Sequence, residues 1–110
     1  MTETFVVCIG NSDDKLSQTE WAEYIDCVRA LVAAYGKHVH FVGYTAPASK
    51  YQSATFVFEP YDGDEEQFLW RLGAAVRRYR QDSAAVVKGE TEFITPRQEP
   101  PIVSVPRSSD

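Results

Sequence analysis

The sequence has few cysteines and no long apolar run, and these absences exclude several classes of protein. Cys8 and Cys27 are the only cysteines among 110 residues and no CxxC pair occurs, so we expect reduced thiols rather than a disulfide framework. No stretch approaches the roughly 20 apolar residues that a membrane helix needs. The apolar run Phe5–Ile9 follows no basic residue and is too short for a signal-peptide core. A cytoplasmic protein with no membrane partner is therefore expected.

Motifs of catalysis and of metal or phosphate binding are also missing. The sequence contains no GxSxG motif, and no stretch has the glycine and lysine spacing of a phosphate loop. His38 and His40 are the only histidines, and two residues apart on a strand they would need a third ligand to hold a metal ion. The sequence therefore nominates no catalytic residue, no metal site and no cofactor.

The charge balance argues against nucleic acid as a general partner. Sixteen acidic residues face eleven basic ones, for a net charge of −5, and polyanions bind basic surfaces. The exception is local, because Arg71, Arg77, Arg78 and Arg80 gather in one predicted helix. We interpret that cluster as a solvated helix face, with an acidic partner or a phosphate as the alternative.

Hydrophobic periodicity predicts two helices and four strands. Ser17-Gln18-Thr19-Glu20 is a capping box, so a helix should follow it to about Tyr35. A second helix should run from Asp62 or Asp64 to about Arg80, with acids leading and arginines trailing as the helix dipole favours. Alternating or continuous apolar segments predict strands at Thr4–Ile9, His38–Tyr44, Tyr51–Glu59 and Ser83–Lys88.

The order strand, helix, strand, strand, helix, strand predicts the fold class. Two right-handed βαβ crossovers give an α+β, ferredoxin-like βαββαβ sandwich: a four-stranded antiparallel sheet with both helices on one face. We expect one domain over residues 1–94, with residues 91–94 as an alternative fifth strand. A proline-rich tail covers residues 95–110, where four prolines fall within twelve residues.

One face of this sheet should be too apolar to remain in contact with water. If Phe5, Val7, Ile9, Phe56 and Phe58 meet the helices, alternation puts another set on the opposite face. We nominate that set as an interface: Val6, Cys8, Val42, Thr55 and Val57. Three occupants are left open: a second copy of the chain in a homodimer, the proline-rich tail, and another protein.

A ligand site is the main alternative to an interface. The loop after the first strand is polar, and strand-end tyrosines lie near loops, so a pocket there would be lined by Asn11, Ser12, Asp13, His40, Tyr44 and Tyr51. The plainer interpretation of the loop is a hydrogen-bonded polar turn leading to the Ser17 cap. We expect the hinge after the second helix, Tyr79–Ser83, to lie at the opposite end of the sheet from this loop.

Four segments resemble a known group of proteins. IGNSDDKLSQTEWAEY, GYTAPASKYQSATFVFE, YRQDSAAVV and TEFI together resemble small uncharacterised proteins encoded by phages and mobile elements of high-GC Gram-positive bacteria. The resemblance implies an accessory protein that acts on a host or defence component inside a bacterial cell. It implies no catalytic residue. We expect a non-enzymatic protein that binds a host protein through its open sheet face, edge strand or tail, with a small dimeric ligand-binding or catalytic domain as the alternative.

Overall fold

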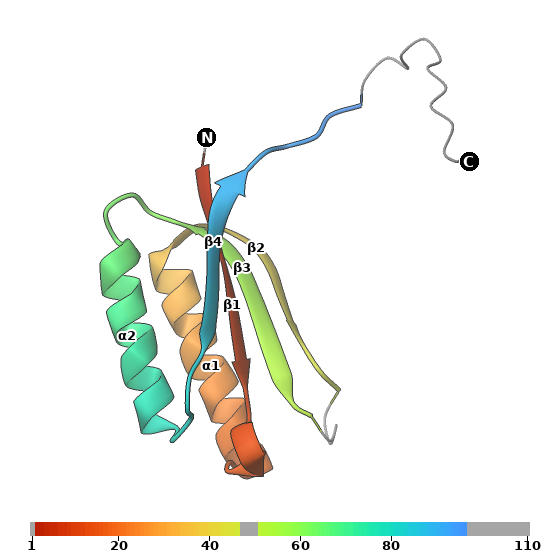
Figure 1. Ribbon diagram of the computed structural model, residues 1–110, viewed down its shortest axis with the longest axis vertical. Coiled ribbons are helices and arrows are strands. Elements are labelled where there is room, and N and C mark those ends of the chain that lie inside the picture. Colours follow the sequence, from red (N-terminus) through yellow and green to blue (C-terminus); the bar gives the residue numbers. More distant parts are fainter. Residues whose placement is uncertain (1, 47–50, 97–110) are drawn as a thin grey trace, which may run out of the picture.

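The chain folds into a four-stranded antiparallel sheet with two helices against one face (Figure 1). The computed structural model describes residues 2–46 and 51–96. The elements follow in the order β1 (Thr2–Gly10), the short 3-10 turn η1 (Ser12–Asp14), α1 (Gln18–Tyr35), β2 (Gly36–Tyr44), β3 (Ser53–Pro60), α2 (Glu65–Arg78) and β4 (Ala85–Thr91). The strand order is β2-β3-β1-β4, which confirms the predicted ferredoxin-like βαββαβ fold with the two most apolar strands in the middle.

The element bounds differ from the predicted ones mainly near β4. This strand starts two residues later than predicted and continues to Thr91, pairing with β1 from Cys8↔Ala85 to Thr2↔Thr91. Residues 92–96 follow without regular structure, so no separate fifth strand forms there. Of the predicted tail, residues 97–110 lie outside the described part of the chain. No helix among the described residues is long and apolar enough to cross a membrane.

Helix α1 begins with the predicted capping box. The Ser17 hydroxyl accepts a hydrogen bond from the Glu20 amide at 3.1 Å, and the Glu20 carboxylate accepts one from the Ser17 amide at 3.0 Å. Both amides belong to the first turn, where no helical partner is available, so the box satisfies them. The buried stripe is Trp21, Tyr24, Ile25, Val28 and Val32.

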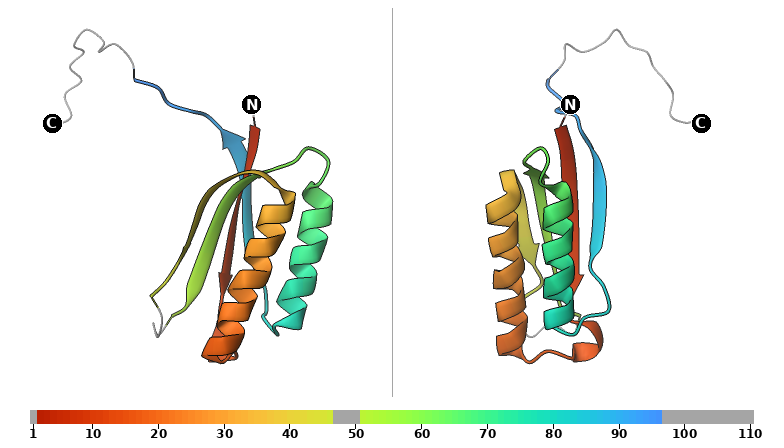
Figure 2. Two further views of the ribbon diagram at one scale, coloured as in Figure 1. Left: turned by 180° about the vertical axis from the view of Figure 1, so that it is seen from behind. Right: turned by 90° about the vertical axis from the view of Figure 1, so that its left-hand side faces the viewer.

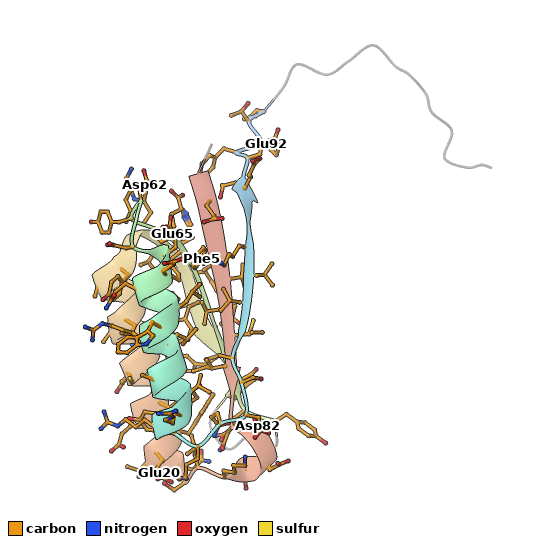
Figure 3. The ribbon with its side chains drawn as sticks, turned by 60° about the vertical axis from the view of Figure 1, so that its left-hand side comes forward. Phe5, Glu20, Asp62, Glu65, Asp82 and Glu92 are labelled. Carbon is orange, nitrogen blue, oxygen red and sulfur yellow. The ribbon has the colours of Figure 1, made fainter. Side chains whose placement is uncertain are left out.

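An aromatic core lies between the sheet and the helices. Phe5 of β1 contacts Phe58 of β3 edge to face at 5.7 Å between ring centroids, and both rings pack against Phe68 of α2. Figure 3 shows Phe5 between the sheet and α2. The predicted helix-facing set is confirmed, since Phe5, Val7, Ile9, Phe56 and Phe58 are all fully buried or nearly so.

A β-bulge changes the predicted faces of β2. Val39 pairs with Phe58 and Phe41 pairs with Val57, so His40 is an extra residue that breaks the alternation. As a result Val42 pairs with Phe56 and packs against the core on the helix side, whereas the predicted alternation put it on the opposite face. Phe41 takes the open side instead. Strict period two holds only where no residue is inserted.

The hinge after α2 also lies elsewhere than predicted. The Ser12 amide donates to Gln81 Oε1 at 2.7 Å, and Lys15 Nζ lies 3.2 Å from Asp82 Oδ1. Figure 3 shows Asp82 at the same end of the molecule as Glu20, with Glu92 at the far end. The expectation of opposite ends was wrong, because α2 follows a strand antiparallel to β1 and so returns the chain to the end where β1 finishes.

Candidate functional site

The sheet face that carries no helix is the most distinctive surface of the molecule (Figure 2). We call it the open face. Strand register and side-chain contacts assign it the following residues: Thr4, Val6, Cys8, His40, Phe41, Thr55, Val57, Glu59 and Val87. Of the nominated interface set, Val6, Cys8, Thr55 and Val57 lie here and Val42 does not.

The open face is apolar at its centre and exposes large side chains toward its edges. Val6 pairs with Val57 on one side and with Val87 on the other, so three valines form a row across β3, β1 and β4. Phe41 is 55% exposed and Val87 is 61% exposed. Beyond the end of β4, Phe93 and Ile94 are also exposed. A folded domain rarely leaves so continuous an apolar surface in contact with water. Such a surface is typical of a binding site.

One acid on this face is buried and paired. Glu59 is 4% exposed, and its Oε2 lies 2.7 Å from Nε2 of His40 on the neighbouring strand. Burying a carboxylate without a hydrogen bond is costly, so the bulge that turns His40 toward Glu59 supplies what the acid requires. An ionised carboxylate can only accept a hydrogen bond, so the tautomer of His40 that carries its proton on Nε2 fits this contact.

An open depression of about 450 Å³ lies beside this pair. Valines of β1, β3 and β4 and the ring of Phe93 make its apolar part, and the hydroxyls of Thr4 and Thr91 hydrogen-bond to each other across β1 and β4. Its lining is Thr4, Val6, His40, Val57, Val87, Gly89, Glu90, Thr91, Glu92 and Phe93. An apolar hollow with one histidine and a few carboxylates suits a small molecule with a polar group. No cluster of metal-ligating side chains is found within residues 2–46 and 51–96.

The loop nominated as a ligand site is instead an internally bonded turn. Asn11 accepts from the Leu16 amide at 2.9 Å and donates to Gln52 Oε1, also at 2.9 Å. Asp13 is exposed and has a φ of 54°, a left-handed conformation that aspartate tolerates. With the Ser12 amide bound to Gln81, the polar groups of this loop bind other parts of the chain.

The other nominated ligand residues do not converge on that loop. His40 lies level with Val57 on the open face, whereas Asn11 is bonded to Gln52 before β3 begins. Tyr44 lies on the helix side of β2, with the Arg29 guanidinium 6.0 Å from its ring centroid. Tyr51 is an exposed side chain at the start of the segment that leads into β3. Asn11, Ser12 and Asp13 therefore share one loop, whereas His40 and Tyr44 lie in other surroundings.

Two residues that are candidates for a functional role, Glu59 and Trp70, were not indicated by the sequence patterns. Glu59 is one acid at the end of an apolar strand, and its partner is 19 residues away in the chain. Trp70 falls outside the buried stripe of α2 and is 69% exposed. An aromatic residue on the polar side of an amphipathic helix is the one signal that would have identified it.

The comparisons with known proteins bear on the fold. No model of a known protein family matches the sequence, and no curated protein sequence matches it. The structure is similar to that of At3g17210 from Arabidopsis thaliana, at 10% identity and a TM-score of 0.54, over 87% of this chain and 100% of that one. It is also similar to SnoaB, a cofactor-independent oxygenase from Streptomyces nogalater, at 11% identity and a TM-score of 0.51, over 88% and 100%. At these identities the similarity establishes the α+β fold alone.

Proposed function

We propose that this protein is a non-enzymatic interaction protein and that the open face is its binding surface. The observation that carries the proposal is the continuous apolar surface from Phe41 through Val57 and Val6 to Val87, uncovered by either helix. Burying apolar surface is favourable by about 25 cal/mol per Å², so the hydrophobic effect favours binding of a partner to the open face.

A second copy of the chain is the occupant we propose. Face-to-face packing of two identical sheets is isologous, so it closes with two copies and leaves no further apolar face. A two-fold axis parallel to the strands brings β4 of one copy over β2 of the other. The end of β4, followed by Glu92, then lies over the start of β2, with Lys37, at the same end of the sheet. Opposite charges at the rim of an apolar centre favour this register.

In the setting that the resemblance implies, the pair acts in the bacterial cytoplasm as a phage or mobile-element accessory protein. Sheet-to-sheet pairing leaves both helices of each copy free for a host or defence protein. The dimer is then the scaffold, and the host protein is its target.

Sedimentation velocity across a wide range of protein concentrations tests whether the chain dimerises through the open face. The wild-type chain should sediment as a dimer, whereas Phe41→Lys and Val87→Lys, at exposed positions of the open face, should shift it to a monomer. Trp70→Lys is the matched control, because it puts the same charge at an exposed apolar position of α2. A wild-type chain that stays monomeric throughout, or a dimer that survives both sheet substitutions, refutes the proposal.

A second candidate function is small-molecule binding in the depression of the open face, favoured by His40, which lines the depression and pairs with Glu59. A thermal-shift screen against nucleotides and metabolites tests it, because a ligand at a hundred times its Kd adds about 2.7 kcal/mol of stability. A stabilising compound should lose its effect in His40→Ala. A screen without hits, or a shift that His40→Ala leaves intact, excludes this site.

A further inference from the structure

The outer surface of α2 has features that neither the fold nor the open face requires. Trp70 projects there with 69% of its surface exposed, while the buried side of the same helix is Phe68, Leu72 and Ala75. Figure 1 shows α2 beside α1 with its far side uncovered by any other element. Tryptophan is among the residues most enriched at the energetic centres of protein interfaces, and it gains little from exposure to water.

Two shallow hollows flank Trp70. The first, of about 240 Å³, lies between α1 and α2 and is floored by Cys27, Leu31 and Ala74. The second, of about 320 Å³, lies on the other side of the indole along Leu69, Gly73 and Ala74. The small residues Gly73 and Ala74 leave room for another backbone to approach, and a Cβ at Gly73 would have nothing within 4 Å. Trp70 therefore forms a ridge between two hollows, each of which can accept an apolar side chain of a partner.

Three arginines surround this ridge. Arg71 and Arg78 line the hollow toward α1, and Arg77 lines the other one. None of the ion pairs found in the described part of the chain involves them, since these are Lys15–Asp82, His40–Glu59 and Arg80–Glu20. This local basic surface complements a short acidic protein segment, whereas the net charge of −5 over the whole chain disfavours a long polyanion such as nucleic acid that extends beyond the surface.

We propose that the outer surface of α2 binds an acidic amphipathic helix of a protein partner. Arg71 and Arg78 are seven residues apart, which is about 10.5 Å along the helix axis. Two acids at positions i and i+7 of a facing helix have the same separation. Apolar residues between them, at i+3 and i+4, then enter the hollow between α1 and α2 beside Trp70. The partner is recognised through two carboxylates and one apolar pair, and the site is independent of sheet-to-sheet pairing.

The experiment uses the full-length protein and a synthetic helical peptide. The probe is a fluorescein-labelled peptide with glutamates at i and i+7 and leucines at i+3 and i+4, and binding is followed by fluorescence anisotropy. We expect saturable binding that weakens at least about tenfold in Trp70→Ala and in Arg71→Glu, the scale of interface-centre side chains. Lys37→Glu on β2 makes the same change in net charge and should leave the affinity unaltered, as should Phe41→Lys on the open face.

A charge swap makes the test specific. A peptide with lysine in place of both glutamates should not bind the wild-type protein, and it should regain binding to the Arg71→Glu/Arg78→Glu variant. The proposal is overturned by an acidic peptide that does not saturate, by affinity that Trp70→Ala and Arg71→Glu leave unchanged, or by a single-stranded oligonucleotide of matched length that binds this surface more tightly. Loss of the dimer in Phe41→Lys with peptide binding intact is the expected result, because the two sites are independent.

Discussion

Glu20 Oε2 accepts a hydrogen bond from Arg80 Nη2 at 3.0 Å, which ties the first turn of α1 to a residue two positions beyond the end of α2. The same carboxylate accepts the Ser17 amide through its other oxygen. These contacts, the Ser17 amide first and then the Arg80 guanidinium, lower the pKa of Glu20 below its ordinary 4.5. One side chain thus caps a helix and joins the two helices at their adjacent ends.

The first prediction concerns acid stability. Because the pKa of Glu20 is lower in the folded chain than in the unfolded one, its contribution is complete above pH 4.5 and is lost as the pH falls through the folded value. Glu20→Gln keeps a capping acceptor but removes the charge. The free energy of unfolding of the variant should therefore fall less than that of the wild type as the pH is lowered from 5. Urea unfolding followed by circular dichroism over that range measures it. Parallel curves for the variant and the wild type would contradict this role.

The second prediction concerns the buried carboxylate of the open face. His40→Ala leaves Glu59 without its hydrogen-bond partner, which should cost about 1–3 kcal/mol of unfolding free energy. The double variant His40→Ala/Glu59→Val removes the buried charge as well, so it should be more stable than His40→Ala alone. His38→Ala, at an exposed position of the same strand, is the control. Chemical denaturation at one fixed protein concentration compares them, and a double variant less stable than the single one would refute the pairing.

Local sequence patterns were sufficient for the architecture because the features that determine it lie close together in the chain. The capping box at Ser17 spans four residues, and the alternation of Phe5, Val7 and Ile9 separates one sheet face from the other. The end at which the Tyr79–Ser83 hinge lies was also derivable, since an antiparallel β1–β3 pair determines where α2 must finish. The predicted position of the hinge was wrong because the direction of α2 was deduced incorrectly from the strand order.

The site was less predictable because it depends on pairs distant in sequence. The bulge at His40 is set by its register against β3, which no pattern within β2 reveals, and it moved Val42 to the helix side and Phe41 to the open face. The polar loop was nominated for its composition, but Asn11 binds Leu16 and Gln52. Polar side chains commonly form hydrogen bonds with the backbone of their own chain, so polar composition alone does not indicate a ligand site.

The third prediction concerns the tyrosine between the helices. Tyr24 is fully buried and stacks on Tyr79 at 4.9 Å, and its hydroxyl has no hydrogen-bond partner among the described residues. Leaving a buried hydroxyl unpaired is unfavourable, so Tyr24→Phe should stabilise the fold by about 1 kcal/mol. Thermal unfolding at neutral pH measures the change, and a clearly destabilised variant would show that the hydroxyl is bonded in solution.

The same residue gives a prediction for alkaline pH. Burial, with a smaller contribution from Cys27, raises the pKa of Tyr24 to about 12. The unfolded chain releases this proton near pH 10, so stability is complete below pH 10 and falls as the pH rises toward 12. Tyr24→Phe should flatten that fall, which unfolding curves at a series of alkaline pH values would show. An equally steep decline in the variant would assign the alkaline loss to other groups.

The last prediction separates two glycines by what surrounds them. Gly36 joins α1 directly to β2 with an extended backbone, φ −92°, so its conformation is open to any residue. Space is the constraint, because a Cβ there would lie 2.6 Å from the Val32 carbonyl oxygen and 3.2 Å from the Phe58 ring. Gly36→Ala should therefore cost about 1–3 kcal/mol. Gly73 lies within α2 with open space around it, so Gly73→Ala should instead stabilise by about 0.5–1 kcal/mol through helix propensity. Denaturation midpoints of the two variants should move in opposite directions, and a shift of Gly36→Ala toward greater stability would mean that the helix-to-strand junction is looser than its backbone contacts require.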